Sequence, residues 1–264
     1  MDFRALGSMS VQENGEELLK AAGKPRQLLA LLLLNEPYRV PNSALITELW
    51  DDAPPQHPMT TLQTHIFYLR KEFARTVGVE SGVIAQELLQ THNGGYRINL
   101  GDARFDLREF HRLRNQAQAL LHAGDQLGAG PVVCEALRRW RGPALLDVEH
   151  GRLLHAAVAK LDESRLDTLA MFFCTQLATG RHREILSELA RLVVRHPHHE
   201  RLRIQFAIAL HQSGYRPQAL QALDELPRAG LQSAGRELSE WVAGLRHAIQ
   251  VDDLTSTDVL QLKV

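Results

Sequence analysis

The sequence predicts a mainly α-helical protein with a small β component: an N-terminal winged helix-turn-helix followed by an all-α domain of tetratricopeptide-like helix pairs. Three observations support this fold class. Three helical segments precede a strand–turn–strand pattern in the N-terminal part of the chain. Strand signals then stop, and the sequence stays helix-rich to about residue 251. A turn-and-helix motif also recurs with the 34-residue period of tetratricopeptide repeats.

The first domain is predicted over residues 1–104. Short strands at its N-terminus lead into three helices. The first helix begins near Pro25, because proline suits the first turn of a helix, and stops at Asn35. The second covers Ser43 to Trp50, and the third runs from Thr60 to about Thr76.

A β-hairpin follows the third helix. Its strands are predicted over Leu88 to Thr91 and Tyr96 to Leu100, on either side of the turn Asn93-Gly94-Gly95. Three helices followed by a hairpin are typical of a winged helix, in which the third helix enters a DNA major groove and the hairpin lies beside it as the wing. The sequence therefore places Arg97 where it reaches an adjacent phosphate or the minor groove, whereas Tyr96 packs the wing onto its own domain.

The third helix is amphipathic in an unusual way. Leu62, Ile66, Leu69 and Phe73 form a single apolar stripe. The opposite side carries hydroxyl groups, aromatic rings and cations, with no acid on its central line, whereas a solvated face would carry more Glu and Lys. Such groups contact base edges and phosphates. The predicted DNA-binding residues are Thr60, Thr61, Gln63, Thr64, Phe67, Tyr68, Arg70, Lys71, Arg75, Asn93 and Arg97.

These residues have different predicted roles. The threonine methyls and Phe67 would contact thymine methyls, and Gln63 would read adenine. Arg70, Lys71 and Arg75 would neutralise phosphates. Two alternatives remain open: a Thr60–Gln63 capping box would tie Gln63 to the backbone, and Phe67 would instead pack on a neighbouring protomer or on the second domain.

Overall charge does not indicate a partner. The 264-residue chain has a formal net charge of −1, with 44% hydrophobic and 23% charged residues. Residues 1–104 contain 10 Lys and Arg against 12 Asp and Glu, a net charge of −2. DNA binding would therefore depend on local charge. A helical-repeat adaptor that binds proteins remains an alternative.

The second domain is predicted over residues 105–251, with a C-terminal tail over residues 252–264. The motif around Gly180 recurs around Gly214, an offset of 214 − 180 = 34 residues. At the same offset, Leu186 and Leu189 correspond to Leu220 and Leu223. About three helix pairs are expected, with the glycine forming the turn within each pair. Within this domain, "WRGPALLDV" (Trp140 to Val148) is interpreted as a packed corner rather than a hinge.

Catalytic and metal-binding motifs are weak. "HPHH" (His196 to His199) suggests a metal site, but adjacent histidines point in different directions, and a helix-to-helix turn is the simpler interpretation. The sequence has no phosphate-loop lysine motif and no G-x-S-x-G motif. We therefore expect no catalytic residues, no metal and no cofactor, and an enzyme is the least favoured class.

The cellular location is predicted from segments that the sequence lacks. The longest apolar run, Leu28 to Leu34, is too short to span a bilayer, and the N-terminus lacks a signal-peptide core. Cys134 and Cys174 lie in apolar helical sequence and are expected to be buried free thiols in a reducing compartment. We expect a soluble, cytoplasmic protein with no membrane partner.

Several motifs together resemble a known family. "GKPRQLLALLLLNEPYRVPNSALITELWDDAPP", "TTLQTHIFYLRKEF" and "GGYRINL" resemble the OmpR-type winged helix of the Streptomyces antibiotic regulatory proteins. "FDLREFHRL", "LRRWRGPALLDV", "LDESRLDTL", "LATGRHREILSELARLVVRHPHHERL" and "ALHQSGYRPQALQAL" resemble the bacterial transcriptional activation domain of the same family. The resemblance covers roughly Met1 to Gln250, and the order of the motifs is more specific than any one of them.

The resemblance implies a transcriptional activator of a secondary-metabolite (antibiotic) gene cluster. It implies binding to direct repeats in double-stranded promoter DNA as a side-by-side dimer, recruitment of RNA polymerase through its sigma subunit, and association with the nucleoid. Phe67 and Tyr68 depart from the family pattern, where smaller or basic residues are expected, as do the glycines and proline of "GDQLGAGPVV". No ATPase module follows, so the chain resembles the small members. A ligand-gated regulator is a further alternative.

Overall fold

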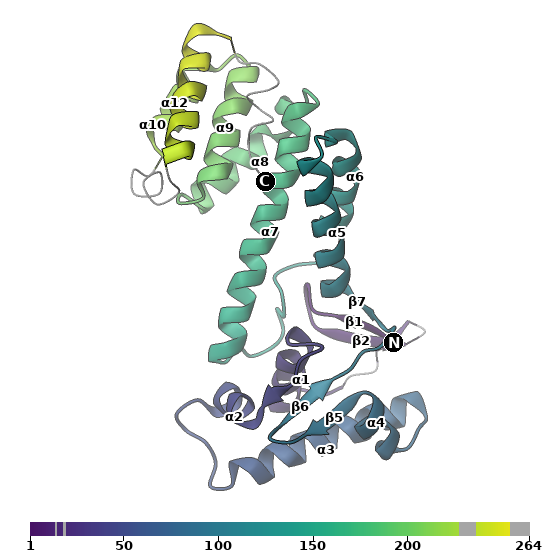
Figure 1. Ribbon diagram of the computed structural model, residues 1–264. Coiled ribbons are helices and arrows are strands. Elements are labelled where there is room, and N and C mark those ends of the chain that lie inside the picture. Colours follow the sequence, from purple (N-terminus) through teal and green to yellow (C-terminus); the bar gives the residue numbers. More distant parts are fainter. Residues whose placement is uncertain (14, 18–19, 227–235, 254–264) are drawn as a thin grey trace. The chain divides into compact units, whose positions relative to one another are not determined.

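The computed structural model describes residues 1–13, 15–17, 20–226 and 236–253 (Figure 1). The chain forms two compact units. The first unit comprises Met1–His111 and Arg138–Arg165, and the second comprises Arg112–Leu137 and Leu166–Val264. Of the predicted C-terminal tail, residues 254–264 lie outside the described residues.

The first unit has the element order of a winged helix, and its three main helices begin and end within about two residues of their predicted bounds. Helix α4 was not predicted from the polar sequence between the third helix and the wing. The elements are β1 (Asp2–Arg4), β2 (Ser10–Glu13), β3 (Glu16–Glu17), α1 (Lys24–Leu34), β4 (Val40–Pro41), α2 (Asn42–Trp50), α3 (Pro58–Val77), α4 (Ser81–Glu87), β5 (Leu89–His92), β6 (Gly95–Ile98), β7 (Arg104–Phe105), the start of α5 (Asp106–His122) and the N-terminal half of α7 (Arg152–Ala178).

Two small sheets flank these helices. The first has the strand order β3-β2-β1-β7, in which β1 pairs antiparallel with β2 and parallel with β7. Phe3 of β1 therefore lies opposite both Val11 and Phe105. The second sheet has the order β4-β6-β5, and its β5–β6 hairpin is the wing.

The core of the first unit is built on α1. Leu28, Leu29 and Leu32 are fully buried, which confirms the prediction that this helix is central in its domain. Helix α3 buries its predicted apolar stripe against the same core. The ring of Phe73 on α3 lies 6.4 Å from that of Phe3, so the N-terminal sheet is packed against the winged helix.

A buried carboxylate on α2 caps the long helix α7. Glu48 is 2% exposed. Its Oε1 accepts a hydrogen bond from the backbone N–H of Gly151 at 2.7 Å, and its Oε2 accepts from Leu153 and Leu154 at 2.8 and 3.0 Å. The side-chain amide of Gln27 on α1 donates to Oε1 at 2.9 Å. Glu48 therefore satisfies N–H groups that the first turn of a helix leaves without partners.

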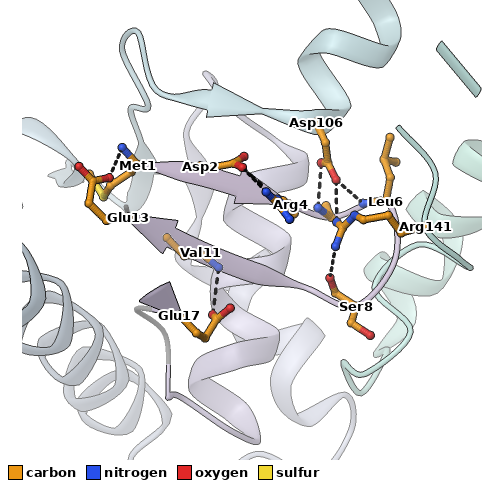
Figure 2. Close-up of polar contacts among 11 residues, drawn as sticks. Met1, Asp2, Arg4, Leu6, Ser8, Val11, Glu13, Glu17, Asp106 and Arg141 are labelled. Carbon is orange, nitrogen blue, oxygen red and sulfur yellow. Dashed lines mark hydrogen bonds and ion pairs between the residues drawn. The ribbon is translucent and has the colours of Figure 1, made fainter. Parts of the chain in front are cut away.

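A second carboxylate, Asp106, joins the N-terminal sheet to the segment after residue 138. Its oxygens accept from the backbone N–H groups of Ala5 and Leu6 at 2.8 and 3.0 Å and from Arg141 at 2.9 Å (Figure 2). Burial raises the pKa of Asp106, and these hydrogen bonds oppose that rise. The backbone of Arg141 also donates to the Leu6 carbonyl at 2.8 Å, and Leu145 donates to Ala5 at 2.9 Å.

The "WRGPALLDV" segment is a packed corner within the first unit. The Trp140 ring is 7% exposed and meets Phe110 edge-on at 5.4 Å. The guanidinium of Arg165 lies 4.9 Å from the centre of the same ring. These contacts, together with the backbone hydrogen bonds to the N-terminal strand, support the corner interpretation over the hinge.

The second unit consists of packed helices (Figure 1). Its elements include the remainder of α5 and α7, α6 (Gln126–Leu137), α8 (His182–Arg195), α9 (Glu200–Gln212), α10 (Arg216–Asp224) and α12 (Arg236–Val251). Helices α8 and α10 begin two residues after Gly180 and Gly214, whose φ angles are 74° and 87°, so the structure confirms the predicted repeat and its glycine turns. Helix α6 runs through the glycines and proline of "GAGPVV".

Two other sequence interpretations concern this unit. His199 accepts a hydrogen bond from the backbone N–H of Leu202 and caps α9, so the histidine cluster forms the predicted turn between α8 and α9.

Both cysteines are free thiols, but only Cys174 is buried, whereas Cys134 is half-buried. No helix in the described ranges is both long and apolar enough to cross a bilayer.

Replacing Gly151 tests the contact between α2 and the start of α7. An added Cβ would lie 2.1 Å from the Glu48 carbonyl oxygen. Because a backbone atom has little freedom to move away, we expect Gly151→Ala to lower the free energy of unfolding by about 1–3 kcal/mol, as overpacking does. Differential scanning calorimetry of the full chain would record this as a lower Tm.

Gly82→Ala in α4 is the matched control, since an added Cβ there meets nothing within 4 Å. We expect it to leave Tm unchanged or to raise it, because alanine favours a helix over glycine. A Tm of Gly151→Ala equal to or above that of Gly82→Ala would contradict the packing described for Glu48.

Candidate nucleic-acid interface

Helix α3 presents the outward face predicted from its sequence. Its stripe of Leu62, Ile66, Leu69 and Phe73 is at most 2% exposed. On α3, the exposed residues among those predicted to bind DNA are Thr60, Gln63, Thr64, Phe67, Tyr68, Lys71 and Arg75. The one acidic residue of the helix, Glu72, is 8% exposed. The outward face of α3 is thus free of acids and carries two cations.

The two aromatic side chains on this face are unusually exposed. Phe67 is 62% exposed and Tyr68 is 44% exposed. Both lie on the same exposed side as Lys71, one helical turn or less away along α3. Exposing a phenylalanine ring to water is unfavourable, so this position favours a partner that covers the face.

The start of α3 differs from the prediction. The helix begins at Pro58, with His57 as its N-cap and no side-chain capping bond, so Thr60 lies within the first turn and the capping-box alternative is wrong. The Thr61 hydroxyl, half-buried, donates to the His57 carbonyl at 3.1 Å, and the Thr64 hydroxyl donates to Thr60 at 2.9 Å. Each hydroxyl keeps its oxygen lone pairs as acceptors, and Gln63 is exposed.

Arg70 lies at the edge of this face and is turned toward the wing. Its Nε and Nη2 donate to the Leu89 carbonyl at 2.9 and 2.6 Å, and Nη2 donates to the Thr91 hydroxyl at 2.8 Å. The guanidinium lies 5.9 Å from the centre of the Tyr96 ring. Burial lowers the pKa of Arg70. Arg70 therefore holds β5 against α3. The sequence had predicted a phosphate contact for this side chain and did not indicate these bonds to the wing.

The tip of the wing is a two-residue turn, Asn93-Gly94. Gly94 has a φ of 76°, as an Asn-Gly hairpin turn requires. Gly95 belongs to β6, and a Cβ there would lie 2.3 Å from the Val40 carbonyl of β4. The predicted three-residue turn therefore has two functions: Gly94 makes the bend and Gly95 permits close strand packing.

Arginines on either side of the wing differ in their surroundings. Arg97 is half-buried, and its Nε and Nη2 donate to the Gln90 side-chain oxygen at 3.1 and 2.6 Å. Arg39 is exposed and donates to the carbonyl of Asn93 at the tip. Arg39 was missed from the sequence because β4, which brings it to the wing, is only two residues long.

Two families of transcriptional regulatory domains match this chain. Residues 105–250 match the family described as bacterial transcriptional activator domain, and residues 15–98 match the family described as transcriptional regulatory protein, C terminal. Regulatory protein DnrI of Streptomyces peucetius is 38% identical, over 94% of this chain and 92% of its own length. Regulatory protein AfsR of Streptomyces coelicolor is 33% identical, over 87% of this chain and 23% of its own length.

A solved structure titled "Mycobacterium tuberculosis EmbR in complex with low affinity phosphopeptide" matches with a TM-score of 0.84 and 26% identity, over 99% of this chain and 68% of that chain. The fold and its matches define a transcriptional regulator with an OmpR-type winged helix and a bacterial transcriptional activator domain. The chain belongs to the Streptomyces antibiotic regulatory protein family.

Replacing Arg70 with lysine tests the contacts of its guanidinium with the wing. Lysine keeps the charge but lacks the planar fork that reaches Leu89 and Thr91 together. We expect Arg70→Lys to lower the free energy of unfolding by about 1–3 kcal/mol because donors to these oxygens are lost. Thermal unfolding would show a lower Tm, with Lys71→Arg as the exposed control that leaves Tm unchanged. Equal Tm values for both variants would argue against the wing contact.

Proposed function

We propose that this protein is a sequence-specific activator that binds promoter DNA through the outward face of α3 and the wing. The observation that carries the proposal is the acid-free exposed face of α3, with two aromatic rings beside two cations. Aromatic and hydroxyl-bearing side chains suit base edges and thymine methyls, and lysine and arginine suit phosphates. The net charge of −2 over residues 1–104 is no obstacle, because exposed charges beyond about 10 Å are screened at moderate salt.

Roles within this surface follow from exposure. Lys71 and Arg75 are the phosphate contacts, since both are exposed cations. Arg39, also exposed, reaches the DNA backbone beside the wing tip. The base contacts come from the exposed residues Thr60, Gln63, Thr64, Phe67 and Tyr68. Thr61, Arg70 and Arg97 support the surface through the internal hydrogen bonds described above, and Asn93 lies at its edge.

Family membership supports the finer proposal. The protein binds direct repeats as a side-by-side pair, through a DNA-binding domain over residues 1–104. Its activation domain, residues 105–251, recruits RNA polymerase through the sigma subunit. The target genes belong to a secondary-metabolite (antibiotic) cluster, and the protein acts in the cytoplasm at the nucleoid. Its relatives include proteins named regulatory protein DnrI and transcriptional regulator RedD.

Selection of fragments from a random DNA pool by the full-length protein tests the proposal. We expect a repeated motif to be enriched at moderate salt, with a fixed spacing between its copies and an affinity that falls steeply as salt rises. Protein that is folded by circular dichroism and enriches no motif at any salt would refute sequence-specific binding and favour the adaptor alternative.

Lys71→Ala tests the assignment of a phosphate contact. Loss of one phosphate contact makes the slope of log K against log salt shallower by about one unit and weakens binding to all sequences alike. Fluorescence anisotropy with the selected DNA at four or more salt concentrations gives both quantities. Lys160→Ala, an exposed lysine on α7, is the control. If the slopes of Lys71→Ala and Lys160→Ala coincide, Lys71 does not contact phosphate.

A further inference from the structure

The first unit contains a polar cavity of about 510 Å³ beside the strands β1 and β7. Its walls come from the N-terminal strand, the start of α5 and the segment that follows α6. The lining residues are Asp2, Arg4, Arg104, Phe105, Asp106, Glu109, Arg138, Arg139 and Arg141. None of these residues was predicted to bind a ligand.

The lining is strongly basic. It holds five guanidinium groups and three carboxylates, so the formal charges of the lining residues sum to +5 − 3 = +2. Phe105 is the one apolar side chain of this lining, and it is 3% exposed, so the cavity offers little surface to an apolar ligand. The surplus charge arises locally, in a chain whose formal net charge is −1.

Two ion pairs lie in the lining: one is within β1, and the other joins the start of α5 to the segment after residue 138. Arg4 donates to Asp2 at 2.9 and 2.6 Å, and Arg141 donates to Asp106 at 2.9 Å (Figure 2). Asp106 also accepts two backbone hydrogen bonds, so its oxygens are already occupied by donors of the protein. Arg104 projects from β7 and is exposed. Asp2 and Asp106 therefore hold two of the arginines in place, and the formal charge of the lining as a whole is positive.

We propose that this cavity binds a small phosphorylated molecule that carries at least two negative charges. The planar fork of arginine matches two oxygens of a phosphate group, which favours phosphate over a simple halide or a neutral ligand. A volume of about 510 Å³ lies within the range of small-molecule sites, roughly 300–1,000 Å³, and exceeds the size of inorganic phosphate. The proposal is independent of DNA binding, because it uses none of the α3 residues.

Occupancy would stabilise the first unit. The cavity residues belong to elements that are remote in sequence, since Arg104 lies 104 − 4 = 100 residues after Arg4 and 138 − 104 = 34 residues before Arg138. A polyanion held by all three would strengthen the attachment of the corner at Trp140 to the N-terminal sheet. Since the ligand binds the folded arrangement, it raises the apparent stability of the protein.

Isothermal titration calorimetry of the full chain with inorganic tripolyphosphate, at constant ionic strength, tests the proposal. We expect saturable binding with one site, and Arg104→Ala to weaken it about tenfold, as loss of one charge-assisted contact does. Arg104→Lys, which keeps the charge without the fork, should weaken it less. Arg183→Ala, an exposed arginine on α8, is the matched control and should leave the affinity within about twofold of the parent.

The Lys71→Ala variant distinguishes the cavity from the DNA-binding face, which also attracts polyanions. Unchanged affinity in Lys71→Ala together with loss in Arg104→Ala supports the cavity. The reverse pattern assigns the polyanion to α3 and overturns the proposal. Equal affinity for sulfate, absence of binding by the folded parent, or binding of a phosphoserine peptide without tripolyphosphate would each overturn it as well.

Discussion

The carboxylate of Glu48 is the constraint on which the first unit depends. It is nearly inaccessible to water, and its two oxygens accept hydrogen bonds from three backbone N–H groups at the start of α7 and from Gln27 on α1. A buried carboxylate without such partners costs several kcal/mol, and so do unsatisfied N–H groups at a buried helix terminus. Here the carboxylate of Glu48 supplies acceptors for the N–H groups at the start of α7, and those N–H groups supply donors for the carboxylate. These hydrogen bonds therefore join the winged helix to the first turn of α7, and Gly151 is the residue that makes room for the contact.

Local sequence patterns were sufficient for much of this fold. The 4-3-4 spacing of apolar residues on α3, Pro25 in the first turn of α1, and the Asn93-Gly94 turn are signals carried by neighbouring residues, and each was found within about two residues of its predicted place. The 34-residue repeat was found for the same reason, because Gly180 and Gly214 mark the turns. The outward face of α3 followed directly from the buried stripe, since the two sides of a helix are fixed by its periodicity.

The remaining features depend on contacts between distant residues. Arg70 looked like a phosphate ligand from its place on the helix, but its partners are Leu89 and Thr91 on the wing, and no local pattern shows that the strand passes beside it. No local pattern marks Glu48, because the backbone N–H groups that it accepts from lie over 100 residues away. The arginine-lined cavity likewise combines three separate segments, each of which is unremarkable alone.

Photocrosslinking tests most directly the claim that the outward face of α3 lies against DNA. A photoreactive phenylalanine analogue would be placed at Phe67, which is 62% exposed on α3, and in a second protein at Tyr215, which is 50% exposed in the second unit. If α3 lies against DNA, we expect a covalent adduct with the selected DNA from position 67 and none from position 215. An adduct from position 215 with none from position 67 would contradict it, because DNA would then lie on a different surface of the protein.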